Sequence, residues 1–225
     1  MCAKGKLVVF EGIDGSGKST QFELMCKTLE RKGISFERVV FPQYSEPSSM
    51  LIRMYLNGEF GTDPEAVNAY AAASFYAVDR YASYIKKWRG YYENGGLILT
   101  DRYTTSNAVH QGSKLTAEAR EGFFKWLYEY EFELLGLPAP DTVIYMDVPL
   151  EVSLEQMRKR EQQTHTHGDI HETDSEYLAK CCESGRQAAK YYGWDVISCV
   201  QGGKMREIED IHGEIYEKLI KTITI

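Results

Sequence analysis

Apolar and polar positions along the chain of 225 residues follow two alternating patterns. Short runs of apolar, often β-branched residues predict strands at residues 6–11, 36–41, 97–101, 142–147 and 195–199. Longer stretches with apolar residues at helical spacing predict helices at 18–33, 47–57, 64–93, 115–136, 150–162, 174–192 and 205–222. Strands that alternate with helices form βαβ units, which favour a mainly parallel sheet with helices on both faces. The pattern therefore predicts an α/β fold.

One stretch follows neither pattern. Residues 161–173 read EQQTHTHGDIHET, are almost wholly polar, and lie between two predicted helices. Such a stretch is typical of a surface loop, and loops of this kind often close over a site as lids. We predict a lid near residues 158–173. Because no repeat, low-complexity segment or linker interrupts the chain, residues 1–225 are predicted to form a single domain.

Composition and charge argue against several classes of protein. The formal net charge is −7, which argues against a protein that coats nucleic acid, because such a protein needs a basic face to replace phosphate counterions. No segment approaches the roughly 18 consecutive apolar residues of a membrane span. The first residues lack the features of a secretory signal, and the five cysteines show no CxxC spacing. We therefore expect a cytoplasmic protein with reduced thiols and with neither nucleic acid nor membrane as a partner.

The strongest motif covers residues 12–19 and reads GIDGSGKS, which fits the pattern G-x-x-x-x-G-K-[ST] in full. Its glycines let the backbone wrap around phosphate oxygens, and Lys18 can reach the β- and γ-phosphates, while the Ser19 hydroxyl can ligate Mg²⁺. The motif follows a predicted strand and opens a predicted helix, whose N-terminus favours anions. It predicts binding of ATP or GTP. The candidate nucleotide-binding residues are Gly12, Asp14, Gly15, Ser16, Gly17, Lys18, Ser19 and Thr20.

A second candidate site follows the predicted strand 97–101. The strand ends in Asp101-Arg102, and the carboxyl edge of an α/β sheet is where such folds bind ligands. Asp101 could hold Mg²⁺, and Arg102 could grip a phosphate of a second substrate. The alternative is an Asp–Arg pair that caps the strand at the surface. The nearby phosphate-binding motif favours the functional interpretation.

The predicted helix 64–93 carries a third candidate. Tyr76 and Arg80 are four residues apart and therefore share one face of the helix, with alanines beside them. An aromatic ring for stacking and a guanidinium for hydrogen bonds to a base edge would make a nucleobase site. A core tyrosine with a surface arginine is the simpler alternative, and the two residues alone favour it.

A fourth candidate is the basic run Arg158-Lys159-Arg160, just before the predicted lid. Cations carried over a γ-phosphate by a closing lid would stabilise the charge of a loose phosphoryl transition state. The solvated basic end of a helix is the more common fate of such a run. Only the neighbouring lid favours a catalytic role.

Together, these motifs resemble the thymidylate kinase family of nucleoside monophosphate kinases through nearly the whole chain. The resemblance is carried by FEGIDGSGKST at 10–20, Phe41-Pro42, FYAVDR at 75–80, and DRY at 101–103 followed by Ser106. It implies a three-layer P-loop kinase fold with a five-stranded parallel sheet in the order 2-3-1-4-5, a lid, and often a homodimer. It also implies transfer of the γ-phosphate of ATP, with Mg²⁺, to a nucleoside monophosphate, and the expected acceptor is dTMP.

The resemblance also implies residue roles. Asp14 would approach the 3′-hydroxyl of the acceptor sugar, and Arg102 would bind the acceptor phosphate. Because glycine stands at position 15, where other members can carry an arginine, lid arginines would supply that charge. The expected catalytic residues are Lys18, Arg102, Asp14, Arg158 and Arg160. The expected acceptor-binding residues are Asp14, Tyr76, Arg80, Arg102, Ser106, Asn107 and Gln111, and the expected Mg²⁺ ligands are Ser19 and Asp101.

The chain departs from the family pattern at two places near the acceptor. After Phe41-Pro42 it has Gln43-Tyr44-Ser45, where an arginine often lies close to the acceptor phosphate. It also has His110-Gln111-Gly112 in place of Tyr-Gln-Gly.

Two other functions stay open at this point. A deoxynucleoside kinase would phosphorylate a sugar hydroxyl, and this chemistry benefits from a carboxylate base near that hydroxyl, often just after the first pair of strands. That stretch here is Phe41-Pro42-Gln43-Tyr44, with the carboxylate of Glu46 only later, so this function ranks second. A catalytically idle homologue would act as a switch that signals through ATP binding alone.

Overall fold

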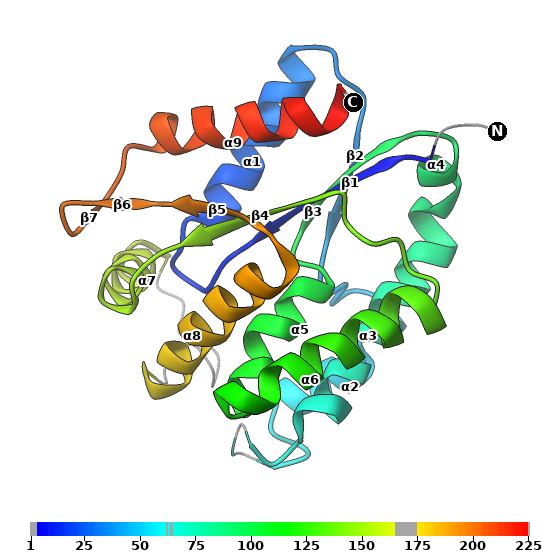
Figure 1. Cartoon of the computed structure of the whole chain (residues 1–225), viewed down its shortest axis with the longest axis vertical. Coiled ribbons are helices and arrows are strands. Elements are labelled where there is room, and N and C mark those ends of the chain that lie inside the picture. Colours follow the sequence, from blue (N-terminus) through cyan, green and yellow to red (C-terminus); the bar gives the residue numbers. More distant parts are fainter. Residues whose placement is uncertain (1–3, 62, 64, 165–174, 225) are drawn as a thin grey trace.

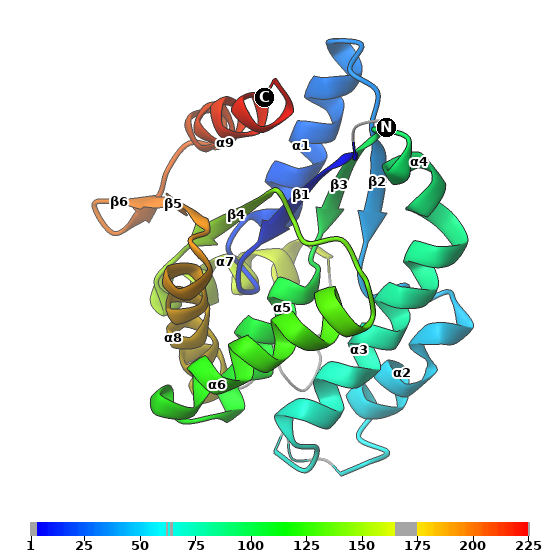
Figure 2. The same ribbon diagram turned by 45° about the vertical axis from the view of Figure 1, so that its right-hand side comes forward.

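The five apolar runs of the sequence form one parallel sheet with helices on both faces (Figures 1 and 2). The structure is a computed structural model and describes residues 4–61, 63, 65–164 and 175–224. The strands are β1 (Lys6–Glu11), β2 (Glu37–Val40), β3 (Leu97–Asp101), β4 (Thr142–Asp147) and β5 (Asp195–Ser198). They lie in the order β2-β3-β1-β4-β5. The predicted α/β class and the strand order implied by the family resemblance are confirmed.

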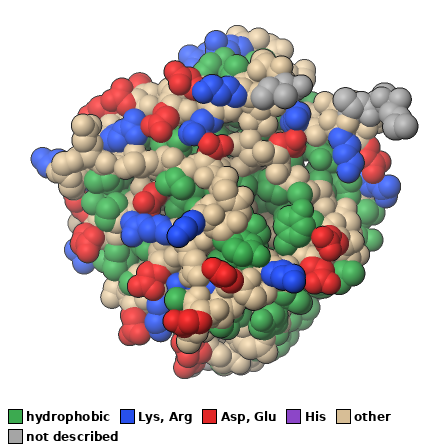
Figure 3. Space-filling model, viewed as in Figure 1, with side chains coloured by type: hydrophobic (Ala, Val, Ile, Leu, Met, Phe, Trp, Pro, Cys, Tyr) green, Lys and Arg blue, Asp and Glu red, His purple; other side chains and the backbone are tan. Residues whose placement is uncertain are grey.

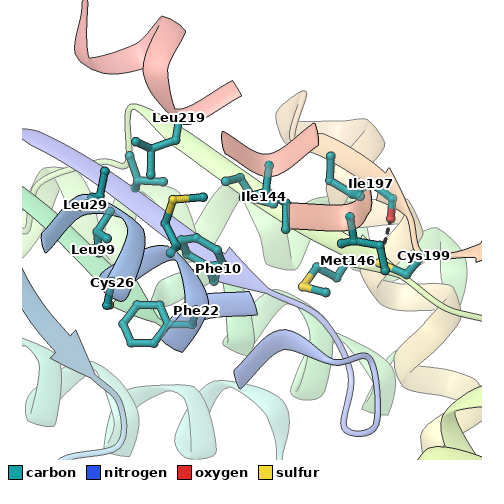
Figure 4. Packing of buried hydrophobic residues seen from close by; sticks show 14 of the residues in the cluster. Phe10, Phe22, Cys26, Leu29, Leu99, Ile144, Met146, Ile197, Cys199 and Leu219 are labelled. Carbon is teal, nitrogen blue, oxygen red and sulfur yellow. Dashed lines mark hydrogen bonds between the residues drawn. The ribbon is translucent and has the colours of Figure 1, made fainter. Parts of the chain in front are cut away.

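The central strand β1 and its neighbour β3 are buried on both faces, and successive side chains of each strand point to opposite sides of the sheet. Phe10 of β1 packs in a cluster beneath α1 (Lys18–Arg31) and α9 (Ile208–Ile223), which Figure 4 shows. Val9, its neighbour in the strand, packs in the cluster on the opposite face, with Tyr84 and Trp88. These strands are therefore apolar along nearly their whole length.

The remaining helices connect the strands and cover the second face and the carboxyl edge. They are α2 (Met50–Leu56), α3 (Ala69–Ser83), α4 (Arg89–Glu93), α5 (Thr104–His110), α6 (Ala117–Tyr128), α7 (Leu150–Thr164) and α8 (Ser175–Tyr192). Short 3₁₀ or π-helical segments adjoin them: η1 (Pro47–Ser49), η2 (Tyr84–Trp88), η3 (Gly112–Lys114) and η4 (Glu129–Leu134). Helix α3 starts five residues later than predicted, because the Asn68 side chain accepts the Ala71 N–H and so caps the helix there.

Two elements differ from the sequence prediction. Helix α5 was not predicted, because its first residues, Thr104-Thr105-Ser106-Asn107, have low helix propensity. Packing against α6 and α8 stabilises this helix. A hairpin of β6 (Val200–Gln201) and β7 (Lys204–Met205) precedes α9, which therefore starts at Ile208 and not at residue 205. Its turn is Gly202-Gly203, with φ of 58° and 76°, as tight hairpin turns require.

The predicted lid lies only partly within the described residues. Helix α7 continues to Thr164, so residues 158–164 are helical and not part of a loop. Residues 165–174 lie outside the part of the chain that the structure describes.

The surface carries charges of both signs. On the face shown in Figure 3, acidic and basic side chains are intermixed, with apolar side chains between them. None of the described helices has the length and hydrophobicity that a membrane span requires.

Three segments with candidate residues leave the sheet side by side at its carboxyl edge. The register pairs Phe10 of β1 with Asp101 of β3, and Glu11 of β1 with Tyr145 of β4. The loop after β1, the segment after β3 and the approach to α7 after β4 therefore meet there. This is the edge at which α/β sheets bind ligands.

Candidate active site

Glycine shapes the loop between β1 and α1. Gly15 and Gly17 have φ of 73° and 84°, in the left-handed region that other residues rarely adopt. A Cβ at Gly15 would lie 2.4 Å from the carbonyl oxygen of Ser153 in α7, and the Ser153 hydroxyl donates to the carbonyl oxygen of Asp14 at 2.6 Å. The loop is therefore packed directly against α7. No larger residue, arginine included, fits at position 15.

This loop lines a cavity of about 910 Å³, called here the P-loop cavity. Its lining residues are Ile13, Asp14, Gly15, Ser16, Gly17, Lys18, Ser19, Thr20, Gln156, Lys159, Arg160 and Met205. Gly12 is the one predicted nucleotide-binding residue outside this lining, and its N–H donates to the Glu11 carboxylate at 2.9 Å. The Ser16 hydroxyl is buried and has no hydrogen-bond partner among the described residues. A glycine cradle with an ammonium and an unpartnered hydroxyl fits a triphosphate.

Helix α7 places only part of the basic run 158–160 beside the P-loop cavity. Arg160 and Lys159 line the P-loop cavity, whereas the exposed Arg158 is not among its lining residues. Lys159 also pairs with Glu155 one turn earlier, at 2.7 Å. The structure thus places one of the two predicted catalytic arginines of this run beside the phosphate loop.

Lys18 forms a buried ion pair with Asp101, in which Nζ lies 2.6 Å from Oδ1. Burial lowers the pKa of Lys18, the charge of Arg102 lowers it further, and Asp101 opposes both. The Ser19 hydroxyl donates to the other oxygen of Asp101 at 3.4 Å. The alternative of a surface-exposed Asp–Arg pair is wrong, because Asp101 is buried. A hydroxyl and a carboxylate side by side are oxygen donors of the kind that Mg²⁺ prefers, so these residues fit the ion.

Arg102 has an unusual backbone conformation. Its φ is 67°, and it is the one non-glycine residue with positive φ in the described part of the chain. Such a conformation costs about 1–2 kcal/mol and persists where surrounding contacts enforce it, often at functional sites. Arg102 Nη2 donates to Asp14 at 2.5 Å, and Nη1 lies 2.8 Å from His110 Nε2 and 3.5 Å from the Ser106 hydroxyl. The side chain is thereby aimed at the phosphate loop.

The Asp14–Arg102 pair stays charged although it is largely buried. Burial alone would raise the pKa of Asp14, but the positive charges of Arg102, of His110 when it is protonated, and of Lys18 outweigh that effect and lower it. Burial alone would lower the pKa of Arg102, but Asp14 and Glu11 raise it. Both side chains are therefore ionised at neutral pH.

A second cavity, of about 790 Å³, lies between α3 and α5 and is called here the α3–α5 cavity. Its lining residues are Asp14, Phe41, Pro42, Tyr44, Leu56, Tyr76, Arg80, Arg102, Tyr103, Ser106, Asn107, His110, Gln111 and Tyr177. All seven predicted acceptor-binding residues are in this lining. The side-chain oxygen of Gln111 is buried and has no partner among the described residues. Because Asp14 borders both cavities, the two adjoin at the phosphate loop.

Arg80 is held by a carboxylate that the sequence analysis did not identify. Its Nε and Nη2 each donate to one oxygen of Glu131 at 2.6 Å, and both side chains are almost fully buried. Glu131 also accepts hydrogen bonds from Thr104 at 2.8 Å and Asn107 at 3.1 Å. The alternative of a surface arginine at position 80 is therefore wrong. No local signal distinguishes Glu131 from Glu129 and Glu133, its neighbours in the sequence.

Glu11, at the end of β1, is a second organising carboxylate. It is fully buried and accepts hydrogen bonds from the Gly12 N–H at 2.9 Å and from the hydroxyls of Thr105 and Ser106 at 2.6 and 2.7 Å. It thereby ties the phosphate loop to α5. In the sequence, Glu11 stands out only as part of the P-loop segment, because the spacing of a motif does not reveal that Thr105, 94 positions away, will contact it.

Comparisons with known proteins give a consistent result. The sequence model of the thymidylate kinase family matches residues 10–191. The thymidylate kinase of Mycobacterium tuberculosis (strain CDC 1551 / Oshkosh) is 31% identical over 172 residues, which cover 76% of this chain and 79% of that protein. The thymidylate kinase of Plasmodium falciparum (isolate 3D7) is 25% identical over 218 residues, 97% of this chain and 91% of that one. The solved structure of the thymidylate kinase from Candida albicans matches the fold with a TM-score of 0.73 at 20% identity, covering 99% and 95% of the two chains.

Proposed function

The chain belongs to the thymidylate kinase family, and on this premise we propose that it transfers the γ-phosphate of ATP to dTMP. The observation that carries the proposal is the meeting of the P-loop cavity and the α3–α5 cavity at Asp14. Phosphoryl transfer requires two phosphates in line, their charge compensated, and water excluded, with little covalent chemistry by the protein. Two adjoining cavities with cations at their junction support the first two of these requirements.

The donor nucleotide is proposed to bind in the P-loop cavity. Lys18 would exchange its partner Asp101 for the β- and γ-phosphates, which leaves the carboxylate next to the Ser19 hydroxyl for Mg²⁺. When bound, Mg²⁺ would neutralise charge on the phosphate oxygens. Arg160 is the arginine that α7 contributes to this cavity, beside Lys159, and we propose that Arg158 joins it on lid closure. These residues would take the place of an arginine at position 15, which the contact of Gly15 with α7 excludes.

The acceptor is proposed to bind in the α3–α5 cavity. Arg102, with Ser106 beside it, would exchange Asp14 for the acceptor phosphate, and Asp14 would then be available to the 3′-hydroxyl of the sugar. Tyr76 would stack on the base, with Arg80, Asn107 and Gln111 at its edge. The unpartnered oxygen of Gln111 supports a base that presents an N–H donor at its edge, as thymine does at N3.

We also propose that the kinase is a single domain that forms a homodimer in the cytoplasm. Tyr70, Val78, Tyr81 and Ile85 are exposed at helical spacing along α3 and η2, an apolar stripe of the kind that a partner helix covers. The four free cysteines found among the described residues support a reducing compartment. Light scattering would test the dimer, with Tyr81→Asp expected to give monomers.

A coupled assay of ADP release tests the proposed reaction. We expect turnover that depends on dTMP and exceeds turnover with thymidine or without acceptor by at least about a hundredfold. Faster turnover with thymidine would favour the deoxynucleoside kinase, although its candidate base, Glu46, pairs with Lys87 at 2.8 Å. Slow turnover that no nucleoside monophosphate stimulates would favour the ATP-dependent switch.

A further inference from the structure

His110 lies between the guanidinium of Arg102 and helix α8. Arg102 Nη1 is 2.8 Å from His110 Nε2, and the Tyr177 hydroxyl is 3.1 Å from His110 Nδ1. The imidazole also stacks on the Tyr177 ring, with centroids 6.2 Å apart and an interplanar angle of 25°. The histidine is therefore fixed on both ring nitrogens and on one ring face.

These contacts determine the protonation of the ring. A guanidinium carries only donors and does not lose its proton in proteins, so Nε2 must accept the hydrogen bond from Arg102. The hydrogen of the neutral ring is then on Nδ1, which donates to the Tyr177 hydroxyl. This arrangement exists only while His110 is neutral, because a protonated imidazole has no acceptor.

We propose that His110 is a positioning residue for the acceptor-phosphate clamp: neutral His110 orients Arg102 through Nε2, and protonation of the ring releases Arg102 and weakens acceptor binding. The proposal rests on the function proposed above, in which Arg102 binds the acceptor phosphate. His110 stands where the family usually has tyrosine. The proposed role makes acceptor binding depend on pH in the neutral range, which a tyrosine at this position would not do.

The charged groups around His110 give the direction of the effect. Arg102 faces it from the end of β3, and Tyr177 and Cys181 face it from α8. Asp14 lies 2.5 Å from Nη2 of the guanidinium, and Glu11 lies 3.8 Å from Nη1, the nitrogen that also faces His110. A second positive charge 2.8 Å from Nη1 repels that end of the guanidinium and so favours its contact with Asp14 through Nη2, while Glu11 remains close to the cation. The acceptor phosphate must then compete with carboxylates that hold the guanidinium more firmly.

The test compares the wild type with His110→Gln and His110→Phe. Glutamine keeps an acceptor that does not titrate, whereas phenylalanine keeps a planar ring without an acceptor. At about pH 8 we expect His110→Phe to raise the KM for dTMP about tenfold or more, with a smaller change in kcat, and His110→Gln to recover at least about threefold of that loss. From about pH 8 to about pH 5.5, the ratio of wild-type KM to His110→Gln KM should rise by about tenfold. Titration of the acceptor's own phosphate affects both proteins and cancels in the ratio.

A second measurement is independent of catalysis. The ¹⁵N resonances of His110, assigned by their loss in His110→Gln, should show a protonated Nδ1 and an unprotonated Nε2 at about pH 8 in the protein without nucleotides. A protonated Nε2 at that pH would overturn the proposal, and so would a KM ratio that stays flat with pH. If the wild type does not phosphorylate dTMP at about pH 8 but the Nδ1–H tautomer is found, the proposed function fails while the His110–Arg102 bond stands.

Discussion

Substitution of Glu131 tests whether its buried carboxylate stabilises the residues that line the α3–α5 cavity. All four of its hydrogen-bond partners are donors: two N–H groups of Arg80, the Thr104 hydroxyl and the Asn107 amide. Glu131→Gln preserves the shape of the side chain but replaces one oxygen with an NH₂ group, which must then face a donor. It also leaves the buried guanidinium of Arg80 without a counter-ion.

The expected loss of stability follows from burial. Removing one partner of a buried ion pair costs about 3–5 kcal/mol, because the remaining charge is left uncompensated. For a chain of this size, such a loss lowers the melting temperature by roughly 6–20 °C. The matched control is Glu133→Gln, an exposed glutamate of the same π-helical segment, for which we expect less than about 0.5 kcal/mol.

Urea unfolding at neutral pH measures both variants. A double-mutant cycle with Arg80→Met isolates the pair, since the arginine should contribute far less stability once Glu131 is neutral. A loss below about 1 kcal/mol for Glu131→Gln, or additivity with Arg80→Met, would refute the argument that uncompensated charge dominates. The folded fraction of Glu131→Gln should also show a raised KM for dTMP, because Arg80 and Asn107 both line the acceptor cavity.

Five further substitutions test the rest of the site. Lys18→Ala should lower kcat at least about a hundredfold in the coupled assay, and a loss within tenfold would argue against its role at the phosphates. Arg102→Ala should lower kcat/KM for dTMP at least about a hundredfold, and equal turnover at low dTMP would contradict the clamp. Arg160→Ala should slow turnover at least about tenfold while Arg158→Ala has a smaller effect, and the reverse order would place the catalytic cation elsewhere on α7. Gly15→Ala should destabilise the protein by more than about 1 kcal/mol in urea, because of its left-handed backbone and the contact with α7, and an unchanged midpoint would mean that α7 can move aside.

The parts of the site that the sequence predicted are those with a local signal. The phosphate loop is a contiguous motif, and the spacing of its residues is enough to predict its geometry. The order of the strands was predicted from the family resemblance. Tyr76 and Arg80 share a helix face by spacing alone, but spacing could not distinguish a base site from a core tyrosine. The cavity beside these two residues depends on α5, whose side chains form its other wall, and spacing within one helix cannot show it.

The parts that the sequence did not predict depend on partners far apart in the chain. Glu131 stands between Glu129 and Glu133, and only the packing of α6 and η4 decides that the middle one is buried. His110 contacts Tyr177 across 67 positions, which hydrophobic periodicity cannot reveal, because a period describes one element and not its neighbour. Helix α5 itself is held by tertiary contacts against its weak intrinsic propensity.

The pairing of Lys18 with Asp101 and of Arg102 with Asp14 has a consequence for selectivity. Each cation at the junction of the cavities already has a carboxylate within 2.6 Å, so an anion gains only the difference between two similar electrostatic attractions when it displaces that carboxylate. Inorganic phosphate offers nothing else and should bind weakly. A whole nucleotide adds the stacking and hydrogen bonds of its base and sugar. We therefore expect the internal counter-ions to favour binding of whole nucleotides over nucleotide fragments and other small anions.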